Sequence, residues 1–188
     1  MTRNIKRIAV SLTVLSALIF VSCSSKYAAY SNEMHTGKKL FQEKEYEKAK
    51  EHFVLASNVQ QDSASLALIG TTYYKMGDIA HAESTIREAE SIDKDSDSFL
   101  RILGYKSLIL LRQDKAEGFN ALRQYVDYIK ALNFPLEIND IEKMIGKNTV
   151  DFAILDPKIE EQATWYEDEK EKFRNGRPGY FSQKSTKR

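Results

Sequence analysis

Small and apolar residues recur along this sequence at an interval of 33 positions, which favours a repeat architecture. Near the end of each copy they are separated by three or four residues, so they lie on one face of a helix. A small residue on such a face lets a second helix approach closely, and a larger apolar residue fills the space beside it. The recurring residues are Gly37, Ala49, Phe53 and Ala56 in the first copy and Gly70, Ala82, Ile86 and Ala89 in the second.

Each copy is predicted to form a helix, a short turn and a second helix. Polar segments at 60–63 and 93–97 separate the copies, and we expect Ser63 and Asp97 to cap the helices that follow them. A chance spacing in a non-repeating helical bundle is the alternative. Both interpretations predict an all-α protein.

A third copy is weaker than the first two. Gly104 aligns with Gly70 at an interval of 34, and Ala116 keeps the small residue of the second helix. Asn120 and Arg123 then stand at the later small or apolar positions. The third unit is therefore predicted to depart from the pattern in its second helix.

This pattern resembles the tetratricopeptide repeat (TPR) family, whose unit is a helix-turn-helix of 34 residues. The glycine at the turn of that family appears as Gly77, with Lys44 in its place in the first unit. The closing proline of the family is replaced by Gln61 and Lys94. The resemblance implies a right-handed superhelical array of about three repeats with C-terminal capping helices. The expected units are 30–62, 63–96 and 97–133, within a repeat region 30–133.

The beginning of the chain has the layout of a secretory signal peptide. Three basic residues precede an apolar stretch at 8–21, whose 14 residues give about 21 Å of helix, less than the ~30 Å of a bilayer core. Ser22 and Cys23 then resemble a bacterial lipobox, with Phe20 where leucine is usual. The resemblance implies cleavage of residues 1–22 and acylation of Cys23, for example with palmitate. A plain secretory signal or a membrane anchor is the alternative.

The lipobox resemblance also implies a localisation, and it changes the net charge of the mature chain. Ser24 after the lipidated cysteine favours the outer membrane, facing the periplasm, and residues 23–29 would form a lipidated linker. The whole chain has 28 Lys and Arg against 27 Asp and Glu. Removing residues 1–22, which hold three basic and no acidic residues, leaves 25 against 27, a net charge of −2. This balance argues against a nucleic-acid binder.

Residues 134–173 are predicted to cap the end of the array. We expect a helix over 137–147 and another that begins at Asp156 and Pro157, while 149–155 fits a strand or a helix. Residues 174–188 contain five basic and no acidic residues, which is typical of a disordered end. Contact of this tail with anionic lipid or a cell-wall polymer is the sharper alternative.

The sequence predicts no catalytic residues, no metal site and no cofactor. The separations between the three histidines match no metal-ligand spacing. Asp93, Asp95 and Asp97 imitate a calcium loop but lack its glycine and its final glutamate. We therefore expect a binding protein and not an enzyme. An enzyme of cell-wall metabolism that uses the C-terminal segment, with carboxylates such as Glu160, Glu161 or Glu167, is the alternative.

In the TPR family the first helix of each unit lines a concave groove that binds a peptide or another protein. Three cations with a tyrosine nearby would suit an acidic or carboxylate-bearing partner. The resemblance thus implies a scaffold for assembly of a pilus, a secretion machine or the outer membrane. The groove residues that it implies are Met34, Lys38, Gln42, Thr71, Lys75, Arg101 and Tyr105.

Overall fold

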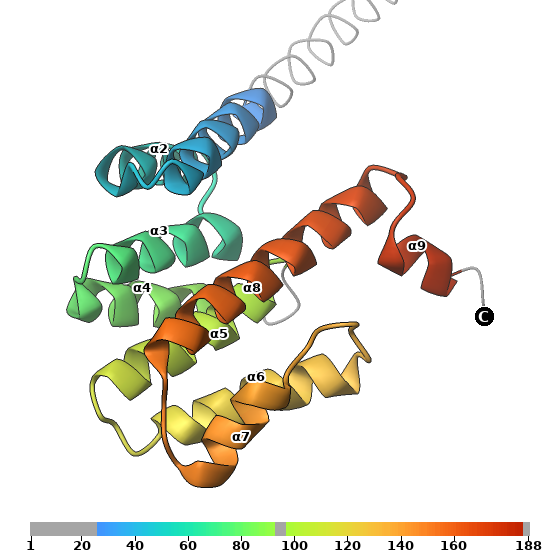
Figure 1. Cartoon of the computed structure of the whole chain (residues 1–188). Coiled ribbons are helices and arrows are strands. Elements are labelled where there is room, and N and C mark those ends of the chain that lie inside the picture. Colours follow the sequence, from blue (N-terminus) through green and yellow to red (C-terminus); the bar gives the residue numbers. More distant parts are fainter. Residues whose placement is uncertain (1–25, 93–96, 186–188) are drawn as a thin grey trace, which may run out of the picture. The chain divides into compact units, whose positions relative to one another are not determined.

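The computed structural model describes residues 26–92 and 97–185, and every regular element in these ranges is a helix (Figure 1). The predicted signal peptide and Cys23 lie outside the described residues. The chain forms two compact units, Met1–Gln61 and Asp62–Arg188. The helices pack as sequential antiparallel pairs, which confirms the all-α prediction.

The first unit contains one such pair. A helix over residues 26–42 is followed by α2 (Tyr46–Val59), whose buried face consists of Ala49, Phe53 and Ala56. A Cβ atom on Gly37 would lie only 2.5 Å from the ring of Phe53. The glycine therefore admits the phenylalanine ring, as the repeat pattern predicts.

The second unit contains the remaining described helices. Helices α3 and α4 form one pair, α5 and α6 form the next, and α8 packs along α5. Further contacts join α4 to α5, α6 to α7 and α8 to α9. The bounds are α3 (Ser63–Lys75), α4 (Ile79–Ile92), α5 (Phe99–Arg112), α6 (Gly118–Ala131), α7 (Asn139–Lys147), α8 (Phe152–Arg174) and α9 (Tyr180–Ser185).

The α3–α4 pair repeats the packing of the first unit. A Cβ atom on Gly70 would lie 2.8 Å from Ile86, the residue that the repeat pattern aligns with Phe53. The N-terminus of α3 is capped one residue earlier than expected, because the side chain of Asp62 accepts a hydrogen bond from the Ser65 amide at 2.8 Å. The prediction of Ser63 as the cap is wrong, since Ser63 is already the first helical residue.

The same turn connects the two helices of each pair. Lys44, Gly77 and Asp114 all have a positive φ, of 64°, 81° and 51°. At each turn this residue and the next donate backbone hydrogen bonds to carbonyls of the preceding helix, as in a Schellman C-cap. The turn glycine of the second unit thus has structural equivalents in both other turns.

The second helix of the third pair starts later than the sequence alignment predicts. Helix α5 continues eight residues beyond Gly104, and the five residues 113–117 precede α6. Ala116 therefore lies in the turn, while Ala121 and Tyr125 hold the positions that Ala82 and Ile86 hold in α4. A Cβ atom on Gly104 would meet the Tyr125 ring at 3.2 Å and Ile159 at 2.6 Å. The third unit keeps the packing pattern with a shift of five residues.

The C-terminal helices differ from the prediction in their boundaries. Helix α7 ends at Lys147 as predicted, before Asn148 at φ 51°, but begins at Asn139 instead of residue 137, and α8 begins at Phe152 with the Asp151 side chain as its cap. The expected helix start at Asp156 is wrong, and Pro157 lies inside α8. The reason is tertiary, because Leu155 is fully buried and holds the turn before the proline in place.

Part of the predicted disordered end is helical. Within 174–188, residues Tyr180–Ser185 form α9. The rings of Tyr180 and Phe181 pack against Phe134, with centroids 6.1 and 5.8 Å away. The prediction of disorder considers only the basic residues of this segment. It misses the free energy gained when two aromatic rings are buried. None of the described helices has both the length and the apolar composition that a membrane span requires.

Candidate functional site

The predicted groove residues of the first unit lie on one face of the helix over 26–42, since they are four residues apart. Met34 is buried, Lys38 is half-buried and Gln42 is exposed. No described contact assigns them a ligand. Their role in partner binding stays a prediction.

Arg101 and Tyr105 of α5 are buried beneath this chain's own helix α8. Arg101 is 2% exposed and donates through Nε to Glu167 at 2.7 Å and through Nη1 to Glu160 at 2.9 Å. The hydroxyl of Tyr105 donates to the other oxygen of Glu160. The acidic groups that the sequence led us to expect on a partner are therefore present on α8.

Opposite charges stabilise the charged forms in this buried cluster. Burial works against the charge on Arg101, but the carboxylates of Glu167 and Glu160 outweigh it and raise the pKa of Arg101. Burial likewise opposes the charge on Glu160, and Arg101 and Tyr105 nevertheless hold the pKa of Glu160 below its usual value. The cluster is a closed set of ion pairs and hydrogen bonds.

A second cluster of hydrogen-bonded side chains holds the beginning of α8 in place. Asp156 accepts hydrogen bonds from the Tyr74 hydroxyl at 2.7 Å and from Nη2 of Arg112 at 2.9 Å. The guanidinium of Arg112 also lies 4.1 Å from the ring centroid of Phe152. Burial raises the pKa of Tyr74, so its hydroxyl remains a donor. Helix α8 is thus held to α5 at both of these points, and to α3 at Asp156.

Helix α3 carries two predicted groove residues, Lys75 and Thr71. Lys75 lies near the Arg101–Tyr105 cluster, and Thr71 is buried. The Nζ atom of Lys75 is 5.6 Å from the ring centroid of Tyr105. Thr71 is fully buried, and among the described residues its hydroxyl has no hydrogen-bond partner. Like Lys38, Lys75 remains half-buried and accessible in part.

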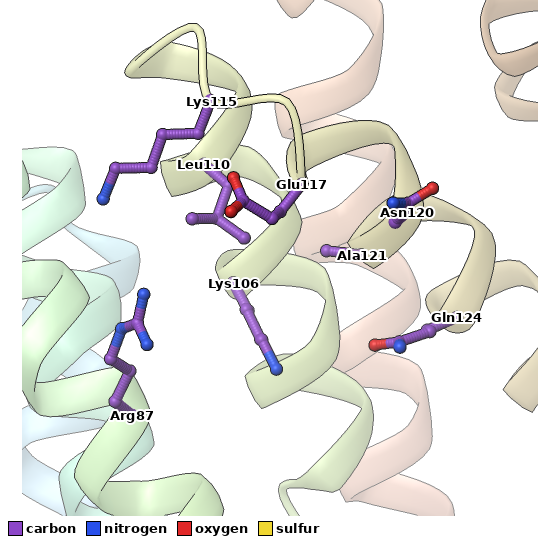
Figure 2. A pocket seen from close by; sticks show the side chains of 8 residues that line it. All are labelled: Arg87, Lys106, Leu110, Lys115, Glu117, Asn120, Ala121 and Gln124. Carbon is purple, nitrogen blue, oxygen red and sulfur yellow. The ribbon is translucent and has the colours of Figure 1, made fainter.

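A separate cavity of about 430 Å³ lies between α4, α5 and α6 (Figure 2). We call it the α4–α6 cavity. Leu110 of α5 and Ala121 of α6 supply apolar surface, and Asn120 and Gln124 of α6 supply amide groups. Its charged lining residues are Arg87 on α4, Lys106 on α5, and Lys115 and Glu117 in the turn before α6.

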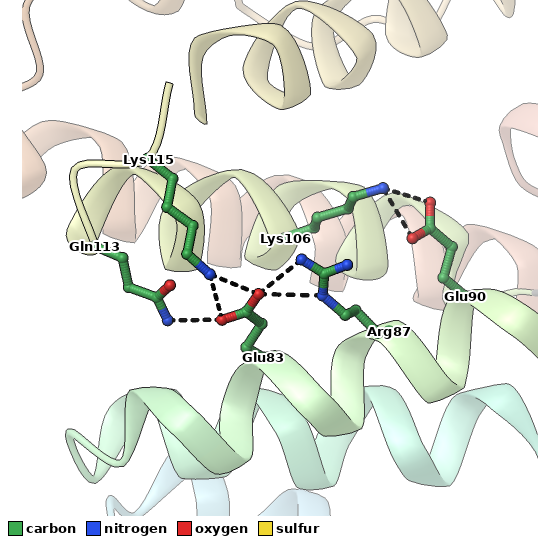
Figure 3. A network of polar contacts seen from close by, with 6 residues as sticks. All are labelled: Glu83, Arg87, Glu90, Lys106, Gln113 and Lys115. Carbon is green, nitrogen blue, oxygen red and sulfur yellow. Dashed lines mark hydrogen bonds and ion pairs between the residues drawn. The ribbon is translucent and has the colours of Figure 1, made fainter. Parts of the chain in front are cut away.

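Two glutamates of α4 hold the cations of this cavity in place (Figure 3). Glu83 accepts hydrogen bonds from Lys115 at 2.8 Å, Gln113 at 2.9 Å and Arg87 at 2.7 Å. These donors, Lys115 first, lower the pKa of Glu83 to about 2. Glu90 accepts two hydrogen bonds of 2.8 Å from Lys106.

The residues of this cavity were not among those predicted from the sequence. The signal that points to them is the irregular third unit, because Lys115 and Glu117 lie in the lengthened turn 113–117. In residues 26–92 and 97–182, no three side chains of His, Cys, Asp or Glu are grouped so that they could hold a metal ion.

Comparison with models of known protein families and with curated proteins finds no match for this chain. What the fold itself defines is a class: an all-helical protein of paired antiparallel helices, packed in sequence order.

Proposed function

We propose that this chain is a lipid-anchored scaffold of the TPR kind that binds another protein of the bacterial cell envelope. The observation that carries the proposal is the repeated packing of glycine against a large side chain. Gly37 with Phe53, Gly70 with Ile86, and Gly104 with Tyr125 are equivalent contacts in consecutive helix pairs. Arrays of this kind present extended surfaces that bind other proteins.

The proposed anchor is Cys23, which follows the signal-peptide pattern in the sequence. At least two acyl chains would hold the protein stably on a membrane, since one chain gives only marginal binding. The helix that starts by residue 26 would then lie close to the membrane surface, because three residues reach about 10 Å at most. We propose the outer membrane, facing the periplasm, with a partner in pilus, secretion or outer-membrane assembly.

Two carboxylates considered for a cell-wall enzyme are already engaged. Glu160 and Glu167 are hydrogen-bonded to Arg101, and Glu160 also accepts from Tyr105. These contacts favour a role in holding α8 on α5. We therefore propose a scaffold and not an enzyme.

The anchor is tested by labelling cells with a fatty-acid analogue and comparing the wild type with Cys23→Ser. We expect label on the wild type alone and loss of the variant from the membrane fraction. The scaffold function is tested by cross-linking in intact cells, followed by purification of the full chain. A defined envelope protein that is cross-linked in the wild type and reduced in Cys23→Ser supports the proposal. Equal labelling of both chains, or no envelope protein on the wild type, overturns the corresponding half.

A further inference from the structure

We propose that the α4–α6 cavity binds a side-chain carboxylate of an acidic peptide segment in the partner. This inference rests on the proposed scaffold function, for which it names the chemistry of the partner. It also places partner binding away from the α5 residues of the predicted groove, Arg101 and Tyr105, which α8 already covers.

Cations from three separate elements converge on this cavity. Arg87 comes from α4, Lys106 from α5 and Lys115 from the turn before α6, and Figure 2 shows Lys106 between Arg87 and Gln124. Their side chains are 61%, 26% and 37% exposed, so a ligand can reach them. Charge-assisted hydrogen bonds from such groups are among the strongest that a carboxylate can accept.

These cations keep donors for a ligand although each is already paired. An ammonium group carries three N–H bonds, and each lysine places two of them on the two oxygens of one glutamate. Arg87 binds Glu83 through Nε and Nη2. Its Nη1 makes no hydrogen bond within the described part of the chain. Glu83 and Glu90 therefore orient the donors without using all of them.

The rest of the lining favours a carboxylate on a hydrocarbon stem. Leu110 and Ala121, which are 5% and 4% exposed, offer apolar surface for methylene groups. The amide groups of Asn120 and Gln124 lie on α6, across the cavity from Arg87 (Figure 2). A volume of about 430 Å³ is within the range of ligand pockets. A glutamate side chain and its neighbouring residues match this combination.

The local charges set the expected strength of binding. Glu83, Glu90 and Glu117 balance Arg87, Lys106 and Lys115, so long-range attraction contributes little and recognition depends on hydrogen bonds inside the cavity. We expect a weak complex, with a Kd between about 1 μM and 1 mM. Glu117 also disfavours a second carboxylate close to the turn.

The test measures fluorescence anisotropy of a labelled octapeptide with two central glutamates, titrated with the full chain. The same peptide with glutamines is the comparison, and we expect it to bind at least tenfold more weakly. Free glutarate is added as a competitor, and we expect it to displace the peptide only at a concentration far above the peptide's Kd. Glutarate binding as tight as peptide binding would mean a small-molecule site and overturn the peptide assignment.

Three variants locate the binding site. Lys115→Gln removes one cation, and Gln124→Trp fills the cavity from an exposed position without changing the core. Both should weaken binding of the glutamate peptide about tenfold. Lys143→Gln is the matched control, because Lys143 is 69% exposed on α7 and does not line the cavity. Thermal melting verifies that each variant is folded.

Binding that is unchanged in both Lys115→Gln and Gln124→Trp, equal binding of the two peptides, or no binding by the wild type overturns the cavity assignment. These results leave the cross-linking test of the scaffold function untouched. The chain could also bind the peptide and yet have no envelope partner in cells. That result would overturn the proposed function and leave the carboxylate site in place.

Discussion

Arg101 on α5 and Glu167 on α8 form a buried ion pair between residues 66 positions apart in the chain. Their side chains are only 3% and 8% exposed. The pair joins the last predicted repeat to the C-terminal segment. It therefore makes the stability of the second unit depend on α8.

We expect Glu167→Ala to destabilise the protein by about 3 kcal/mol, because it leaves the buried guanidinium short of a partner. Arg101→Met combined with Glu160→Gln and Glu167→Leu should recover much of this loss, since it removes the guanidinium together with both carboxylates that it serves. Urea denaturation of the full chain measures both effects. Lys143→Ala, which breaks an exposed pair with Asp140, should leave stability nearly unchanged, because water screens that pair. An equally small effect of Glu167→Ala would contradict the proposed role of α8.

The glycine at the α3–α4 contact can be tested with a single methyl group. In Gly70→Ala the new Cβ would lie 2.8 Å from a side-chain carbon of Ile86 and 3.3 Å from its backbone nitrogen. We expect a loss of about 1–3 kcal/mol from overpacking, measured by thermal and urea unfolding. Gly146→Ala in α7 is the control, because a Cβ there meets nothing within 4 Å and should stabilise the helix by up to about 1 kcal/mol.

The Glu83 network predicts a dependence of stability on acid pH. Its three donors lower the pKa of Glu83 from 4.5 to about 2 in the folded chain. Its contribution to stability is therefore complete above pH 4.5 and is lost as the pH falls toward 2. Glu83→Gln should destabilise the chain at pH 7 and make the stability curve flatter between these values. The measurement is urea denaturation as a function of pH, and an unchanged curve in the variant would contradict the prediction.

The cap of α3 gives a fourth prediction. Asp62→Ala removes the acceptor for the Ser65 amide and should cost about 1 kcal/mol. Glu45→Ala is the matched control, since Glu45 occupies the same position before α2 but caps no backbone amide, and its carboxylate pairs instead with exposed Lys48. Chemical denaturation compares the two. Equal losses would mean that the capping bond contributes little.

The paired helices could be predicted because their packing is determined by residues close together in the sequence. Gly37 and Phe53 are 16 positions apart, as are Gly70 and Ile86, and the spacing of such pairs repeats. The shift of the third unit could not be predicted in the same way. Asp114 adopts the turn conformation of Lys44 and Gly77, but nothing in the alignment shows that α5 runs on past Ile109, the position aligned with the last residue of α3.

The covered face of α5 could not be predicted because it depends on distant partners. Arg101 has the charge expected of a groove residue, and its acceptors come 59 and 66 positions later. The predicted start of α8 at Pro157 is wrong for a different reason. Pro157 is a good first residue for a helix, but Leu155 and the contact between Phe152 and Arg112 add a turn before it.

The lengthened turn 113–117 shows how a helical array can acquire a new surface chemistry without altering its core. Lys115 and Glu117 lie in this turn, which is two residues longer than the earlier ones, and Gly104 still packs against Tyr125. Insertions at a turn are tolerated far better than changes at the glycine contacts. Substituting residues 115–117 alone should therefore change which peptide the α4–α6 cavity binds and leave the helical fold intact.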